Sequence, residues 1–102
     1  MRHLIYTDQA EADLQQIADY VEQETLDEDA AIAFVDRIQD KCAYLAGLPG
    51  TLGTSRPDLR EDMRSTPFQG YVIFFRYRNE LFEVVNVLHG SKDLIAYFGD
   101  DG

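Results

Sequence analysis

The 102-residue sequence has one cysteine, three prolines and seven glycines, and it lacks a long apolar run. The single cysteine, Cys42, excludes an intramolecular disulfide framework and a zinc site built from several cysteines. So little proline and glycine excludes a linker-like or low-complexity chain. The first residues are unlike a signal peptide, and no segment approaches the roughly 18 apolar residues needed to span a bilayer. We therefore expect a cytoplasmic protein with one domain over residues 1–102, ending in a short polar tail at about 99–102.

Basic residues are also scarce: 9 Lys and Arg stand against 19 Asp and Glu, for a formal net charge of −10. Residues 1–50 hold three basic and eleven acidic side chains, whereas residues 51–102 hold six basic and eight acidic ones. Affinity for nucleic acids comes largely from Lys and Arg that release counterions from phosphates. The composition thus argues against a nucleic-acid partner, because RNA chemistry would need a local basic patch acting against an unfavourable overall field.

Two long segments have helical periodicity. Thr7 or Asp8 is the expected N-cap of a helix over residues 8–24, and a second helix is predicted over 28–47. The acidic residues between them suit the dipole of the second helix and lack the spacing of a calcium loop. Cys42 lies on an apolar stripe, which favours a buried structural thiol over a nucleophile. The two stripes are Ala10, Leu14, Ile17, Ala18 and Val21, and Ala31, Phe34, Val35, Ile38, Cys42 and Leu45.

Four segments have the β-branched and aromatic composition of strands: residues 3–7, 63–68, 71–78 and 81–89. Asn79–Glu80 is the expected two-residue turn between the last two, and residues 48–62 form a long connection without periodicity. In this register Arg76 faces Glu83, and alternation divides the last two strands into two mainly apolar faces. One face holds Val72, Phe74, Arg76, Arg78, Leu81, Glu83, Val85 and Val87, and the other holds Tyr71, Ile73, Phe75, Tyr77, Phe82, Val84 and Leu88.

The predicted order of elements is β-αα-βββ-α, an α+β fold with a helical hairpin packed on a small, mainly antiparallel sheet. The hairpin covers one sheet face. The second apolar face must be covered by another part of this chain or by a partner segment, through helix-in-groove packing or strand addition.

An ordered set of segments carries a family resemblance. "ADLQQIADYV", "AAIAFVDRIQDKCAYLAGLPG", "MRSTPFQGYVIFFRYR" and "VVNVLHGSKD" follow one another in the pattern of the RelE/ParE toxin superfamily of bacterial type II toxin–antitoxin modules. The chain resembles the ParE branch over nearly its whole length, fading only in the last residues. The resemblance implies a helical hairpin on a small sheet, no cofactor, and a cognate antitoxin whose carboxy-terminal segment wraps the toxin in a hetero-oligomer.

The target implied by the resemblance depends on the branch. ParE-like members poison DNA gyrase, whereas RelE-like members cut messenger RNA within the ribosome. The ParE resemblance implies a gyrase inhibitor that acts by protein–protein contact, arrests growth or stabilises a plasmid, and binds no nucleic acid on its own. Two alternatives stay open: a ribosome-dependent messenger RNA endoribonuclease, and a decayed, non-toxic binding module. Members are often neutral to basic, so the acidic charge departs from the pattern and weighs against RNA cleavage.

Metal-independent RNA cleavage requires a base, an acid and cations that stabilise the charge developing on the phosphate. If the chain is a nuclease, its candidate catalytic residues are Arg64, Arg76 and His89; the two arginines match positions where RNA-cutting relatives hold the phosphate. An ion pair with Glu83 is the structural alternative for Arg76. The sequence favours no metal site, because two isolated histidines accompany no cysteine cluster. The candidates for binding the target or antitoxin are Arg56, Arg60, Arg64, Arg76 and Lys92.

The stretch "VLHGSKD" contains the residue types of a hydrolase triad, His89, Ser91 and Asp93. In such a triad the histidine lies between the other two, and triad members normally come from distant segments. Three alternate residues of an extended chain do not form that line unless the chain folds back. We therefore interpret Gly90 as a strand-ending bend, Ser91 as the N-cap of a final helix and Asp93 as part of its first turn.

Overall fold

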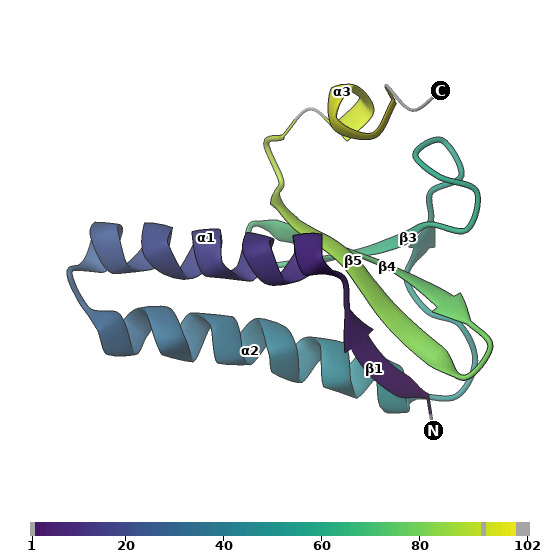
Figure 1. The fold of residues 1–102 in the computed structure, drawn as a ribbon, viewed down its shortest axis with the longest axis horizontal. Helices are drawn as coiled ribbons and strands as arrows, with labels where there is room; N and C mark the ends of the chain where they lie inside the picture. Colours follow the sequence, from purple (N-terminus) through teal and green to yellow (C-terminus); the bar gives the residue numbers. More distant parts are fainter. Residues whose placement is uncertain (1, 93, 100–102) are drawn as a thin grey trace.

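The computed structural model describes residues 2–92 and 94–99, which form five strands and three helices (Figure 1). The order of elements matches the predicted fold, with one addition, the short strand β2. The elements are β1 (His3–Tyr6), α1 (Asp8–Thr25), α2 (Glu28–Gly47), β2 (Thr54–Ser55), β3 (Arg64–Phe68), β4 (Tyr71–Arg78), β5 (Leu81–His89) and α3 (Leu94–Gly99).

The strands form one sheet in the order β1-β5-β4-β3-β2. β1 pairs in parallel with β5 because the α1–α2 hairpin carries the chain across the sheet, whereas the other three pairings are antiparallel. β2 lies within the connection that we expected to be irregular, and its two residues are too few to produce a periodic signal. Within the described residues, no helix is both long and apolar enough to cross a bilayer.

Local capping sets the helix boundaries close to those predicted. Thr7 is the N-cap of α1, and its hydroxyl accepts a hydrogen bond from the backbone N–H of Ala10 at 3.0 Å. Asp27 caps α2 by accepting from the N–H groups of Asp29 and Ala30. The joint between the helices is Leu26, a non-glycine residue in the left-handed conformation with φ of 55°.

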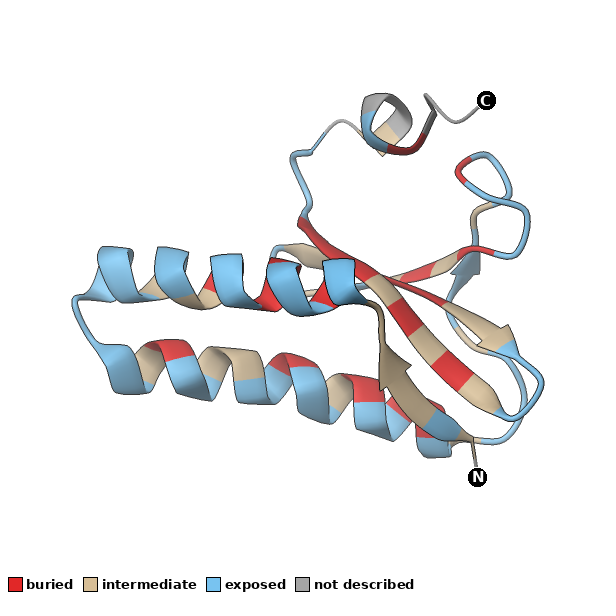
Figure 2. Ribbon diagram, viewed as in Figure 1, coloured by how far each residue is buried: buried red, intermediate tan, exposed pale blue. Residues whose placement is uncertain are grey.

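The main core lies between the helical hairpin and one face of the sheet. Figure 2 shows buried positions along the central strands and on the inner sides of both helices, with exposed positions on the outer sides. Phe75 and Phe82 stack at 4.8 Å between ring centroids, and Cys42 is fully buried beside them, as the apolar stripe of α2 predicted. Each large buried side chain of this kind contributes about 1.5–3 kcal/mol through the apolar surface it removes from water.

A β-bulge corrects the predicted assignment of side chains to the two faces. The register shifts by one residue between Phe74 and Phe75, so that Phe75 pairs with Val84 and Phe74 pairs with Asn86. The extra residue reverses the alternation beyond it. Val87 therefore packs in the main core and Leu88 on the opposite face, the reverse of our expectation.

The second face is covered by the chain itself. Leu59 and Met63, from the loop before β3, and Phe98, from α3, pack against Phe74 and Leu88 in a second core. The rings of Phe74 and Phe98 lie 5.1 Å apart between centroids. We expected a segment to cover this face of the sheet. The chain itself supplies that segment, so no partner is required for it.

Helix α1 is also fastened to β5 by polar side chains beyond the end of β1. The hydroxyl of Thr7 donates to the carbonyl of Val85 at 2.7 Å. Asp13, which is 4% exposed, accepts from the N–H of Val87 at 2.9 Å and from the side-chain amide of Asn86 at 3.1 Å. Since β1 pairs only as far as Val84, these side chains supply partners that a neighbouring strand would otherwise provide.

Candidate functional site

Arg76 is held by an ion pair, as its predicted register implied. It lies directly opposite Glu83 in the sheet, and its Nε donates to the Glu83 carboxylate. Its Nη1 also lies 3.8 Å from a carboxylate oxygen of Asp62, in the loop before β3. Arg78 is more exposed and approaches the same Glu83 oxygen at 3.7 Å. The Arg76 guanidinium is therefore neutralised by acidic neighbours from two elements.

Arg64 fixes a close approach of the backbone. Its Nε donates to the carbonyl of Leu52 at 2.7 Å, and its Nη2 donates to the carbonyl of Gly53 at 3.0 Å. A Cβ atom at Gly53 would lie 2.7 Å from the ring of Phe75 and 2.8 Å from the Ser65 carbonyl, so only glycine fits there. Arg64 thus holds the loop that leads into β2 against the sheet.

The sheet separates the three candidate nuclease residues. Arg64 pairs with Phe75 and shares its face, whereas Arg76, the next residue along β4, projects from the opposite face. His89 pairs with Tyr71, five residues from Arg76, which corresponds to roughly 17 Å of extended strand. These three side chains do not converge on a position where a single phosphate could contact all of them.

His89 lines a small cleft between α1 and the end of β5, with a volume of about 200 Å³. Its ring contacts Tyr71 edge-on at 5.4 Å between centroids, and burial raises the pKa of the Tyr71 hydroxyl. Its Nδ1 accepts from the backbone N–H of Ser91 at 3.1 Å and lies 2.7 Å from the Ser91 hydroxyl. Because Nδ1 is an acceptor here, the ring proton of the neutral imidazole lies on Nε2.

This contact corrects our interpretation of "VLHGSKD". The chain does turn back at Gly90, whose N–H donates to the carbonyl of Gly70, and the turn brings His89 and Ser91 together. Ser91 lies within that turn and is not the N-cap of α3, which begins only at Leu94. Asp93, the third member of the apparent triad, lies outside the described residues.

The remaining candidate cations have separate local partners. Arg56 forms two hydrogen bonds with Asp58, at 2.9 and 3.1 Å, which raise the pKa of the arginine and lower that of the carboxyl group. The Arg60 guanidinium lies 5.4 Å from the centroid of Phe98, and the Lys92 ammonium lies 5.2 Å from that of Tyr97. Both cations therefore lie against aromatic rings of α3.

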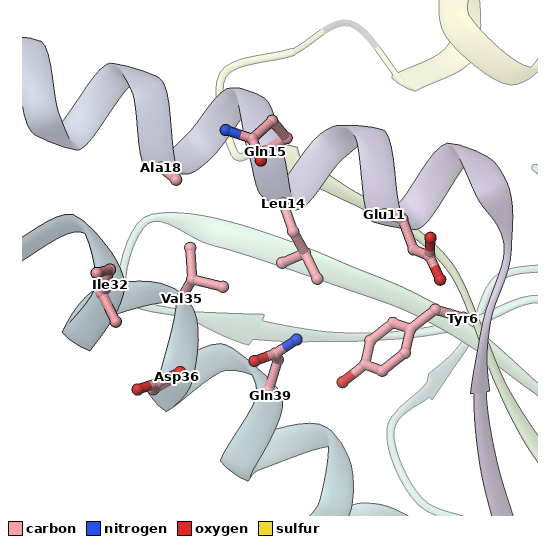
Figure 3. Close-up of a pocket in the computed structure, with 9 residues that line it drawn as sticks. All are labelled: Tyr6, Glu11, Leu14, Gln15, Ala18, Ile32, Val35, Asp36 and Gln39. Atoms are coloured by element: carbon pink, nitrogen blue, oxygen red, sulfur yellow. The ribbon is translucent and has the colours of Figure 1, made fainter. Parts of the chain in front are cut away.

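A groove runs between α1 and α2, and the sequence did not predict it. Figure 3 shows its lining: side chains of α1 and α2 face each other, and Tyr6 projects into it from β1. Its volume is about 350 Å³. One feature of the sequence could have indicated the groove: the apolar positions of α2 extend beyond the core-facing stripe to the exposed Ile32. The lining residues are Tyr6, Glu11, Leu14, Gln15, Ala18, Ile32, Val35, Asp36 and Gln39.

Tyr6 lines the groove, and the fully buried Cys42 thiol lies next to the Tyr6 hydroxyl; burial keeps both groups neutral. Burial raises the pKa of the Cys42 thiol to about 11, and it also raises the pKa of the Tyr6 hydroxyl. Among the described residues, the buried Tyr6 oxygen has no hydrogen-bond partner that satisfies normal geometry. A thiol that stays protonated at neutral pH is a poor nucleophile. In the described part of the chain, no group of three or more His, Cys, Asp or Glu side chains could hold a metal ion.

Comparisons with known proteins agree with this fold. Residues 4–94 match the family described as the ParE toxin of type II toxin–antitoxin system, parDE. A solved structure described as the chromosomal ParDE TA system from P. aeruginosa aligns with a TM-score of 0.74 and 18% identity. The alignment covers 87% of this chain and 96% of that one. No curated protein matches this sequence. Because the family match spans most of the sequence, this chain belongs to the ParE toxin family of type II toxin–antitoxin systems.

Proposed function

We propose that this ParE-family toxin inhibits DNA gyrase by protein–protein contact and that a cognate antitoxin neutralises it. The observation that favours this function over ribonuclease activity is the separation of Arg64, Arg76 and His89. Arg64 and Arg76 lie on different faces of the sheet, and His89 lies roughly 17 Å along the strand from Arg76. RNA cleavage requires an acid, a base and cations around one phosphate, whereas an inhibitor that binds a protein surface does not.

The charge distribution supports the same proposal. A protein with a formal net charge of −10 is repelled by the phosphate-rich surroundings of the ribosomal messenger RNA. The candidate cations are engaged within the fold: Arg56 by Asp58, Arg76 by Glu83 and Arg64 by backbone carbonyls. These three arginines would have to give up their contacts to bind a phosphate.

Arg60 and Lys92 are the residues that we propose contact the target. Both have exposed side chains that lie over aromatic rings of α3, and aromatic residues and arginine are enriched at protein interfaces. Charge reversal at these positions should weaken gyrase inhibition. Arg37→Glu on α2 is the matched control, because it makes the same change in charge on a different element.

A gyrase supercoiling assay with purified protein tests the proposed function directly. We expect loss of supercoiling, or accumulation of cleaved DNA, at stoichiometric toxin. The assay should run beside a translation reaction in which messenger RNA is monitored for ribosome-dependent cleavage. An unaffected gyrase together with cleaved messenger RNA would reject the proposal in favour of the nuclease.

Two variants separate the nuclease from the gyrase inhibitor in cells. His89→Gln removes a candidate acid–base group at an exposed position, and Arg76→Ala removes a candidate phosphate ligand. We expect both variants to arrest growth as long as circular dichroism shows them folded. The nuclease hypothesis requires both to lose toxicity. Induction of the unaltered protein alone tests the decayed-module alternative, which requires normal growth.

A further inference from the structure

The cleft between α1 and the end of β5 gathers hydrogen-bond donors from separate parts of the chain. Gln16 and Tyr20 come from α1, Tyr71 from β4, His89 from β5 and Lys92 from the turn that follows β5. Each of these side chains carries an N–H or O–H donor. The volume of about 200 Å³ corresponds to roughly six water molecules. The cleft therefore suits a small ligand that offers hydrogen-bond acceptors.

Charge distinguishes this cleft from the rest of α1. Six of the 18 residues of α1 are acidic and none is basic, but Asp13 is the only one of the six that lines the cleft. Its carboxylate already accepts hydrogen bonds from Val87 and Asn86 within the fold. The other lining residues of α1 are uncharged, and Lys92 is the only Lys or Arg among the described lining residues. An anion thus meets less repulsion here than on the remaining surface of the helix.

Aromatic side chains form part of the wall. The Tyr71 ring contacts His89 edge-on at 5.4 Å between centroids and packs against Phe34 at 5.7 Å. Burial and, to a smaller extent, the charge of an ionised Tyr20 raise the pKa of the Tyr71 hydroxyl, so the two hydroxyl groups lie near each other. The Tyr71 hydroxyl consequently stays protonated at neutral pH and can donate. Since Tyr20 is 55% exposed, part of its ring is open to a ligand.

The turn at Gly90 determines which nitrogen of His89 faces a ligand as a donor. The Nδ1 atom accepts from the backbone N–H of Ser91 at 3.1 Å, which places the ring proton of the neutral imidazole on Nε2. The turn does not use this Nε2–H group. A ligand that accepts from it finds the tautomer already set, which lowers the cost of binding.

We propose that this cleft binds a small molecule with one carboxylate group on a flat aromatic ring. The carboxylate accepts from the Nε2–H of His89 and pairs with Lys92, while the ring lies against Tyr20 and Tyr71. One negative charge matches the one lysine. A second charge would be repelled by Asp13 and by the other acidic side chains of the α1–α2 hairpin, which has eleven acidic and two basic residues. Binding of this ligand requires neither gyrase nor an antitoxin.

Titration of the purified toxin with benzoate tests the ligand class. We expect saturable binding with a dissociation constant on the order of 1 mM, as is typical of so small a ligand. Nuclear magnetic resonance should show the largest shifts at the backbone amides of Tyr71 and His89. Benzamide keeps the ring and lacks the charge, and inorganic phosphate has more charge and no ring; both should bind at least about fivefold more weakly.

A pair of adjacent glutamines tests the location of the site. Gln16→Glu and Gln15→Glu make the same change in charge at exposed positions of α1, but only Gln16 lines this cleft. We expect Gln16→Glu to raise the dissociation constant for benzoate about fivefold or more, because it places a second carboxylate beside the ligand. Gln15→Glu should raise it by less than about twofold.

The two lysines of the sequence form a second matched pair. The ammonium group of each lies near a tyrosine ring, at 5.2 Å from the centroid of Tyr97 for Lys92 and at 5.7 Å from that of Tyr44 for Lys41. Only Lys92 lines the cleft. We expect Lys92→Gln to weaken benzoate binding about tenfold and Lys41→Gln to weaken it by less than about twofold. Circular dichroism verifies that each variant is folded.

Three results would overturn the proposal. The first is a lack of saturable benzoate binding to the unaltered toxin. The second is binding of benzamide or phosphate as tight as that of benzoate, which would contradict the ligand class. The third is an equal effect of the two variants within either pair, which would place the ligand elsewhere. Because the assay contains only the toxin and the probe, these results are independent of the outcome of the gyrase assay.

Discussion

Replacing Asp13 with alanine tests how the helical hairpin is joined to the sheet. One carboxylate oxygen of Asp13 accepts from both the N–H of Val87 and the side-chain amide of Asn86, and the other accepts from Gln9. Asp13 and Asn86 are each 4% exposed, so water does not readily replace the lost acceptor. A buried donor left without a partner costs about 1–3 kcal/mol.

The expected loss for Asp13→Ala follows from the two donors that depend on it. The N–H of Val87 loses Asp13 as its acceptor, and β1 ends too early to supply another. The Asn86 amide still donates to the Tyr97 hydroxyl at 3.1 Å. The full cost of an unpaired Val87 N–H and a partial cost at the Asn86 amide together lower the unfolding free energy by about 2–4 kcal/mol. Asp13→Asn should cost about 1 kcal/mol or less, because its amide oxygen can still accept from Val87 and Asn86.

Urea unfolding followed by far-ultraviolet circular dichroism measures these changes. Asp19→Ala is the control, because Asp19 is an exposed residue of the same helix and its carboxylate accepts from Gln15 on the helix surface. We expect it to change stability by less than about 0.5 kcal/mol. If Asp13→Ala loses no more than Asp19→Ala does, the hydrogen bonds to β5 do not stabilise the hairpin and the reasoning is refuted.

Two further predictions concern the hairpin and its core. Stability should fall as the pH rises from 9 to 11, because burial raises the Cys42 pKa to about 11 from 9.0, so the unfolded chain loses this proton first. The protonated thiol contributes its full stabilisation below pH 9, and its loss lowers the unfolding free energy by about 2–3 kcal/mol. Cys42→Ala should reduce the dependence of the unfolding free energy on pH in this range. If that dependence is unchanged, other groups cause it. Leu26→Gly should stabilise the fold by about 0.5–1 kcal/mol in urea unfolding, because Leu26 has a φ of 55° and is 89% exposed; destabilisation would mean that its side chain packs in solution.

Local chemistry determined the helices and the β4–β5 hairpin. Capping groups and apolar periodicity depend only on neighbouring residues, so the sequence predicted both helices of the hairpin to within a residue. The two-residue turn at Asn79–Glu80 sets the pairing of the adjoining strands, which is why the Arg76–Glu83 pair could be predicted.

The tertiary structure decided which distant groups meet. The bulge in β5 moved Val87 and Leu88 to the opposite faces, since its position depends on packing from both sides. The burial of Asp13 depends on where β1 stops beside β5, which a helical pattern does not encode. The parallel pairing of β1, the groove between α1 and α2, and the separation of His89 from Arg76 likewise result from long-range packing, because sequence periodicity assigns a residue to a face but not to its neighbours on other elements.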